Sequence, residues 1–137
     1  MTLKNERKRL INFISRFSKA RVLVVGDIVL DHYIWGKVSR ISPEAPVPVV
    51  NVTRESLLLG GAANVVHNIH RLGGTVRVCV IGHDEAGRQL LHLLHAQGIN
   101  TDGLVVDHCR PTTIKTRIIA HNQQVVEKYW RRLARFP

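Results

Sequence analysis

Two aspartates near the start of the chain occupy places where carboxylates often bind ligands. Asp27 follows the apolar run 22–25 and a glycine, and Asp31 comes four residues later. An apolar run that ends at glycine is typical of a strand, and open α/β sheets bind ligands at the carboxyl ends of their strands. Carboxylates at that position can accept hydrogen bonds from sugar hydroxyls. The alternative for Asp27 is that it only ends the strand or caps a turn.

A glycine pair, Gly60 and Gly61, precedes a helical pattern that contains Asn64 in its first turn. Two glycines allow the backbone to approach a ligand closely, and the free N–H groups of a helix start suit oxygen-rich or anionic groups. The Asn64 amide adds a donor and an acceptor. The pair lacks the third glycine of a dinucleotide fingerprint and the lysine of a P-loop, so neither is predicted. A tight turn without a ligand remains the alternative.

Lys115 and Arg117 alternate along a predicted strand and therefore lie on the same face of it. Together they could hold a phosphate, although a solvated strand face competes equally as an interpretation. Two histidine pairs have helical i, i+3 spacing but no carboxylate or cysteine partners at metal-ligand spacing: His67 with His70, and His92 with His95. We expect solvated helix faces there and no metal site.

The elements that position these residues alternate between strand and helix. Non-alternating apolar runs predict buried strands, and three-and-four spacing predicts helices. This order is typical of βαβ units, so we expect an α/β fold with a largely parallel sheet covered by helices. Strands are expected at 21–25, 76–81, 104–106 and 112–120, and helices at 3–18, 62–72 and 84–97.

Two features lie outside this alternation. Short strands around 33–35 and 47–52, interrupted by prolines, predict a small flap whose second strand is at a sheet edge. The basic, amphipathic segment 3–18 is expected to pack on the domain that follows, with a targeting or membrane-surface segment as the alternative.

Composition narrows the class of protein. The chain has 137 residues with 20 Lys and Arg against 10 Asp and Glu, a formal net charge of +10. A basic nucleic-acid-binding module is therefore an alternative, but aromatic interleaving and zinc spacing are missing. No apolar run reaches the ~20 residues of a membrane helix, and no secretory signal is visible. With Cys79 and Cys109 read as free thiols, we expect a cytoplasmic protein without a membrane partner.

Together these motifs resemble the PfkB/ribokinase-type carbohydrate kinases, over roughly residues 15–126. The Ser-Pro-Glu-Ala-Pro-Val-Pro-Val run at 42–49 is similar to the lid of one branch, the D-glycero-D-manno-heptose 7-phosphate kinases of ADP-heptose and lipopolysaccharide biosynthesis. Further segments that resemble the family are 24–31, 60–65, the Gly-x-Asp-x-x-Gly segment 82–87, 111–117 and 122–124.

The resemblance implies a ribokinase-like three-layer α/β domain with a small β lid, of which residues 1–137 are the N-terminal part. The lid, at about 33–53, would close over the sugar and offer a surface for a homodimer. ATP and Mg²⁺ serve the complete family, and this part of the domain is expected to bind neither. The substrate would be a sugar phosphate. The resemblance implies that the sugar hydroxyls bind at Asp31, Gly60, Gly61 and Asn64, with Asp27 as an additional ligand-binding residue. It implies that the sugar phosphate binds at Lys115, Arg117 or Gln124.

Two departures from the family bear on activity. The catalytic aspartate of a Gly-Ala-Gly-Asp-like segment, whose backbone also forms the anion hole, does not occur in these residues. The basic segment 127–137 also departs from the family and is expected to reflect a frameshift, or else a C-terminal helix. We therefore expect a kinase by family that is inactive in this form. A non-catalytic sugar-phosphate-binding or regulatory fragment is the alternative.

Overall fold

The computed structural model of this chain describes residues 3–77 and 80–130. The predicted alternation of strands and helices is confirmed, although the strand expected at 76–81 is described as two pieces on either side of residues 78–79. The elements in chain order are α1 (Leu3–Ile14), η1 (Phe17–Lys19), β1 (Arg21–Leu23), β2 (Ile28–Ile41), β3 (Pro48–Gly61), α2 (Ala62–Arg71), β4 (Thr75–Arg77), β5 (Val80–Gly82), α3 (Glu85–Ala96), β6 (Val105–Asp107), β7 (Thr113–Ala120) and β8 (Gln123–Trp130).

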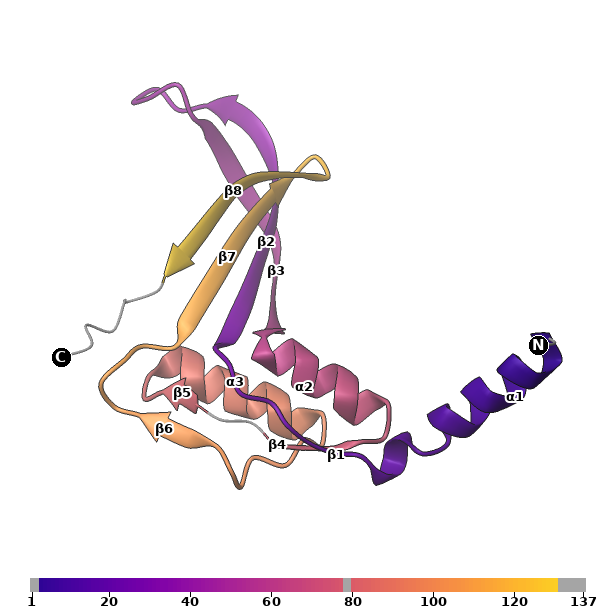
Figure 1. Cartoon of the computed structure of the whole chain (residues 1–137). Helices are drawn as coiled ribbons and strands as arrows, with labels where there is room; N and C mark the ends of the chain where they lie inside the picture. The colour runs from indigo at the N-terminus through magenta and orange to yellow at the C-terminus, as the bar shows by residue number, and fades with distance from the viewer. Residues whose placement is uncertain (1–2, 78–79, 131–137) are drawn as a thin grey trace.

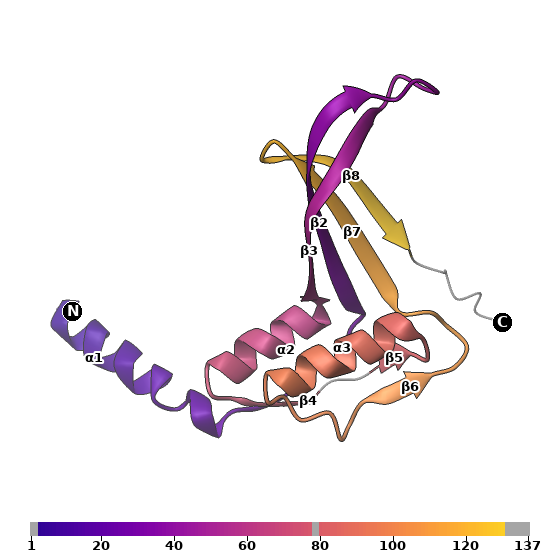
Figure 2. The same cartoon turned by 180° about the vertical axis from the view of Figure 1, so that it is seen from behind.

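Short parallel strands and two helices form the α/β part of the molecule. Strand β1 pairs with β4 and β5 pairs with β6, both in parallel. Helices α2 and α3 lie side by side along these strands in both views (Figures 1 and 2). The prediction that the first strand is buried on both faces is wrong: Leu23 is 65% and Val25 77% exposed, whereas Val22 and Val24 are partly buried. Among the described residues, the helices cover only one face of these strands.

The largest sheet, to which we give the name lid, stands away from the helices in Figure 1. Its strand order is β3-β2-β7-β8, with β2 and β7 parallel and both outer pairs antiparallel. The sequence predicts two short flap strands, around 33–35 and 47–52. The observed strands β2 and β3 are much longer, with 14 residues each. This sheet is mixed, whereas the strands along the helices pair in parallel, as expected for the core. The predicted edge position of the proline-rich strand is confirmed, since β3 lies at the edge.

A two-residue turn at His121 and Asn122 joins β7 and β8. His121 has a φ of 51° and Asn122 a φ of 62°, the left-handed values that a tight hairpin turn requires. Strand β8 begins at Gln123 and includes residues 127–130, so the start of the basic tail is a strand and not a helix. Residues 131–137 lie outside the described residues.

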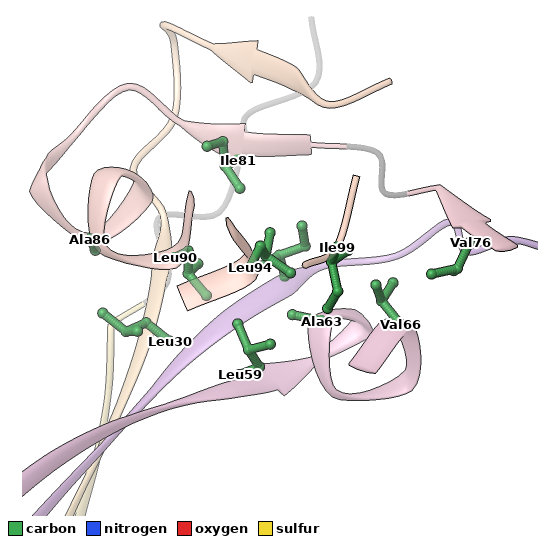
Figure 3. Packing of buried hydrophobic residues seen from close by; sticks show 11 residues of the cluster. Leu30, Leu59, Ala63, Val66, Val76, Ile81, Ala86, Leu90, Leu94 and Ile99 are labelled. Carbon is green, nitrogen blue, oxygen red and sulfur yellow. The ribbon is translucent and has the colours of Figure 1, made fainter. Parts of the chain in front are cut away.

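The core joins the base of the lid to the two helices (Figure 3). Leu90 and Leu94 of α3 are fully buried, as is Val66 of α2, and they pack in one cluster with Leu30 of β2 and Leu59 of β3. Complete burial of a leucine side chain contributes about 1.5–3 kcal/mol. The lid strands are thus held at one end by the same apolar contacts that hold the helices together.

Helix α1 forms where its periodicity predicts it, but it does not pack on the domain that follows. Leu10 is 62%, Ile11 54% and Ile14 60% exposed. In Figure 1 the helix projects away from the other elements. Within residues 3–77 and 80–130, therefore, its apolar side chains remain uncovered.

The Gly-x-Asp-x-x-Gly segment at 82–87 connects α3 to the start of β7. The Asp84 carboxylate caps α3 by accepting a hydrogen bond from the Gly87 N–H at 2.8 Å, and it accepts a second from the Thr112 N–H at 2.7 Å. A Cβ at Gly87 would overlap the Gly82 carbonyl oxygen. Burial raises the pKa of Asp84, but the hydrogen bonds from Thr112 and Gly87 outweigh it and hold the pKa below its ordinary value. In the structure this motif has a structural role.

Replacing Asp84 by asparagine should therefore lower stability in a pH-dependent way. At pH 7 we expect a loss of about 1 kcal/mol in the free energy of unfolding, as for a lost helix cap. Because the folded pKa is depressed, the stabilisation is complete above the unfolded pKa of about 4 and disappears as the pH falls through the folded value. Urea unfolding at pH 7 and pH 3 measures this. The exposed Asp102→Asn should change stability by less than about 0.5 kcal/mol at either pH. A loss that is equally large at pH 3 would contradict the role of the ionised carboxylate.

Candidate functional site

Asp31 lies on β2 and forms an ion pair with Arg117 of β7. Its Oδ1 accepts a hydrogen bond from Arg117 Nη1 at 2.6 Å, and each side chain is 18% exposed. The Arg117 guanidinium also lies over the Tyr33 ring, 5.0 Å from its centroid. Burial lowers the pKa of Arg117, but the hydrogen bond to Asp31 and the charge of that carboxylate offset this and raise it. The parallel β2–β7 register places Tyr33 opposite Arg117 and Asp31 opposite Lys115.

The glycine pair lies directly against Asp31 at the end of β3. A Cβ at Gly60 would overlap the Asp31 carboxylate, so only glycine fits there without a shift. Gly61 has a φ of 55°, a value that favours glycine, and its added Cβ would be 2.5 Å from the Asp27 carbonyl oxygen. The same carbonyl accepts a hydrogen bond from the N–H of Ala62, the first residue of α2, at 3.0 Å. The predicted close backbone approach is thus present, and it brings Gly60 and Gly61 together with both aspartates.

Asp27 lies between β1 and β2, as the sequence predicts, and faces a second arginine. Its Oδ1 is 3.2 Å from Arg110 Nη1, and the Nε of Arg110 is 3.4 Å from Asp107 Oδ2. Arg110 follows strand β6, so this pair connects the segment after β1 to the segment after β6. Asn64 lies in the first turn of α2 and is exposed. Within the described part of the chain, the Asn64 side chain forms no hydrogen bond, so it is not joined to the Asp31–Arg117 pair in that way.

Lys115 and Arg117 share one face of the lid, as predicted, and both contact the same acid on β8. Glu127 Oε1 is 3.3 Å from Lys115 Nζ, and Glu127 Oε2 is 3.5 Å from Arg117 Nε. The hydrogen bond from Lys115, with contributions from Gln124 and Arg117, holds the pKa of Glu127 below its ordinary value. Gln124 Nε2 donates to Glu127 Oε2 at 3.1 Å. The structure thus brings the three predicted phosphate-binding residues together around a carboxylate.

We call this surface the polar lid face. It consists of Asp31, Tyr33, Lys115, Arg117, Glu127 and Tyr129, which contact one another across β2, β7 and β8.

Sequence analysis missed several residues of this region. Arg110 and Glu127 were not predicted as partners of the candidate residues, and Arg54, which lies 3.9 Å over the Trp35 ring, was not singled out. Their contacts join residues as far as 83 positions apart in the chain. Arg110 stands directly before Pro111 in the sequence, but no local pattern there indicates that its partner is Asp27.

Metal-ligating side chains do not cluster in the part of the chain that the structure describes. Within residues 3–77 and 80–130, His, Cys, Asp and Glu side chains form no group of three or more that could hold a metal ion. Asp27 and Asp31 each face an arginine instead. The solvated helix face expected for the second histidine pair is present, since His92 and His95 are exposed, whereas His67 and His70 are partly buried. Cys109 is a free, exposed thiol, and Cys79 lies outside the described residues. In the described part of the chain, no helix combines the length and apolar character that crossing a membrane requires.

Two bacterial proteins that are more than half identical to this chain in the aligned region have the same name. "Bifunctional protein HldE" of Geotalea uraniireducens is 53% identical over 122 residues, covering 88% of this chain and 25% of the relative. The protein of the same name from Desulfatibacillum aliphaticivorans is 55% identical over 114 residues, covering 82% of this chain and 23% of the relative. The chain therefore spans about a quarter of the length of these relatives.

Solved structures of sugar kinases share the fold. A microbiome-derived acarbose kinase, Mak1, is 30% identical with a TM-score of 0.61, covering 86% of this chain and 38% of that one. A carbohydrate kinase from Agrobacterium tumefaciens is 21% identical with a TM-score of 0.65, covering 81% and 35%. A fructokinase with bound ATP from Xylella fastidiosa is 24% identical with a TM-score of 0.59, covering 81% and 33%. At 21% and 24% identity, the carbohydrate kinase and the fructokinase are evidence for the fold alone. The ribokinase-like α/β fold that the sequence predicts is thereby confirmed.

The sequence profile described as pfkB family carbohydrate kinase matches residues 19–135, which includes the lid, the glycine pair and both arginine-paired aspartates. The chain belongs to the pfkB family of carbohydrate kinases.

Proposed function

We propose that this chain carries the sugar-binding side of a kinase that phosphorylates a heptose 7-phosphate. The observation that carries the proposal is the position of Asp31, whose carboxylate lies between the Gly60 backbone and Arg117. Sugars present many hydroxyls, and a carboxylate fixed by a charged partner can accept hydrogen bonds from them without moving. Identities near 50% to relatives named HldE, together with the lid motif at 42–49, support a heptose as the sugar.

In this proposal two groups of residues hold the two ends of the substrate. Asp31 accepts from hydroxyls, and Gly60, Gly61 and Asn64 offer backbone and amide groups at the start of α2, with Asp27 as a further acceptor. Lys115 and Arg117 lie on the polar lid face, Gln124 donates to Glu127 of that face, and the three side chains supply donors for the phosphate. The spacing between the groups is set by strand β2, which links the glycine pair to β7. The lid keeps water from the sugar and offers its surface to a second subunit.

The reaction assigned to the whole domain transfers the γ-phosphoryl group of ATP to the anomeric hydroxyl, which gives a heptose 1,7-bisphosphate. Such a transfer needs a base near the hydroxyl and donors for the transferred phosphoryl group. The 137 residues contain no Gly-Ala-Gly-Asp-like segment, and the two candidate aspartates, Asp27 and Asp31, are each paired with an arginine. The residues of this chain therefore bind and orient the sugar, and we propose no proton transfer or metal-assisted step by them. The cytoplasm is the proposed location.

The first prediction concerns turnover. Purified 137-residue chain supplied with ATP, Mg²⁺ and D-glycero-D-manno-heptose 7-phosphate should form ADP no faster than a sample without the sugar, because no general base is present. A coupled ADP assay measures this, with a complete HldE protein as the positive control. Sugar-dependent ADP formation that is lost in Asp31→Asn would contradict the prediction.

The second prediction concerns binding. Replacing Asp31 by asparagine should weaken binding of D-glycero-D-manno-heptose 7-phosphate at least tenfold, a size typical of hydrogen bonds to a charged group. Isothermal titration calorimetry measures the dissociation constant, and thermal melting of each variant verifies folding. Glu55→Gln is the matched control. Glu55 lies on β3 and pairs with His32, so this substitution removes one negative charge outside the proposed site. Equal losses in both variants would contradict a specific role for Asp31.

A third prediction tests the glycine pair. Alanine at Gly60 should displace the Asp31 carboxylate, because the added Cβ overlaps it, and should weaken heptose 7-phosphate binding about tenfold or more. Gly26→Ala is the control, since its Cβ would meet only the Ala62 methyl at 3.4 Å. Titration calorimetry of both variants gives the comparison. Unchanged binding by Gly60→Ala would show that the close approach does not serve the sugar.

A further inference from the structure

Glu127 has a position that the sugar-binding proposal does not explain. It pairs directly with Arg117 across β7 and β8, and its two carboxylate oxygens point to two different cations. Oε1 contacts Lys115 Nζ at 3.3 Å, and Oε2 contacts Arg117 Nε at 3.5 Å. A phosphate bound between a lysine and an arginine would use its oxygens in the same way.

The charges of the polar lid face cancel in the described structure. Lys115 and Arg117 contribute two positive charges, and Asp31 and Glu127 contribute two negative ones. Arg117 is shared between both acids, because Nη1 donates to Asp31 and Nε faces Glu127. Lys115 lies 5.6 Å over the Tyr129 ring in addition to its contact with Glu127. An incoming phosphate therefore meets no excess of positive charge on this face.

We propose that the Glu127 carboxylate occupies the anion position between Lys115 and Arg117, so that a phosphate-bearing sugar binds there only by displacing it. The inference rests on the proposed sugar-phosphate function and makes Glu127 a residue that sets the preference of this chain between phosphorylated and neutral sugars. Displacement is feasible, since the Glu127 side chain is 38% exposed at the outer strand.

Glu127 carries its negative charge at neutral pH, where ordinary glutamates are ionised. The hydrogen bond from Lys115, the Gln124 amide and the charge of Arg117 hold the pKa of Glu127 below its ordinary value, as expected for a carboxylate that is paired with cations. Repulsion between this charge and a phosphate adds to the loss of the two ion pairs. The Asp31–Arg117 contact does not involve Glu127 and remains available to orient a sugar hydroxyl.

The test compares the complete 137-residue chain with Glu127→Gln, which keeps the size of the side chain and removes its charge. We expect Glu127→Gln to bind D-glycero-D-manno-heptose 7-phosphate about threefold to fivefold more tightly, the effect of one exposed charge close to a phosphate. Binding of the same heptose without phosphate should stay unchanged. Glu55→Gln, which makes the same charge change elsewhere on the lid, should leave both affinities unchanged.

A purely structural role for Glu127 predicts a different pattern. Loss of a structural brace would weaken both ligands, or neither, and would lower the melting temperature. Equal or weaker binding of the sugar phosphate by Glu127→Gln overturns the proposal. Glu127→Ser is a second variant that also removes the charge, and it replaces the first if Glu127→Gln does not fold.

Inorganic phosphate separates this inference from the sugar-binding proposal. If neither heptose ligand binds the unaltered chain, the proposed function fails, and phosphate titrated at low salt then decides the role of Glu127. Tighter phosphate binding by Glu127→Gln than by the unaltered chain and Glu55→Gln supports the inference. Equal phosphate binding by all three proteins, or none in any of them, overturns it.

Discussion

The ion pair between Asp31 and Arg117 is the contact on which the candidate site depends. It joins residues 86 positions apart and fixes the side chains that the parallel β2–β7 register brings to one face. At 18% exposure each, the two groups have lost much of their hydration, so each requires the other as a partner. The glycine at position 60 follows from the same contact, because any side chain there would occupy the space of the carboxylate.

The lid can hold this pair only because its base is anchored in the apolar core. Leu30 and Leu59 belong to β2 and β3 and pack against Leu90 and Leu94 of α3. Asp84 and Thr112 then connect the start of α3 to the start of β7. One end of each of the three strands β2, β3 and β7 is thus fixed relative to the helices. The charged and aromatic contacts of the polar lid face begin close to this anchored end, since Asp31 directly follows the core residue Leu30 on β2.

The placement of charge on the polar lid face limits what this surface can bind. Four ionised groups, two of each sign, lie within contact distance across three strands, and aromatic rings of Tyr33 and Tyr129 lie beneath the cations. Such a face can exchange internal partners for ligand groups with little change in net charge. This arrangement differs from a simple basic patch, although the chain as a whole carries a formal charge of +10. Net charge alone is therefore a poor guide to its ligands.

Local patterns were sufficient for the elements and for the motif residues. Apolar runs, helical spacing and glycine stops predicted the α/β order, and prolines predicted the edge strand β3, because these signals depend on neighbours within a few residues. The same patterns identified Asp31, the glycine pair and the Lys115–Arg117 alternation. They failed for the burial of β1 and the length of the lid strands, because both depend on which other elements cover or pair with them.

By itself the sequence determined the family, the fold class and the candidate ligand-binding side chains, since motif spacing and periodicity are local properties. Only the tertiary structure decided how those side chains are paired. Asp27 with Arg110, Asp31 with Arg117 and Glu127 with Lys115 each join different strands or strand ends. The choice of partner depends on sheet register, and register is fixed by the packing of the whole domain. For that reason the charged groups can be identified from the sequence, whereas the fold determines which of them form ion pairs with one another.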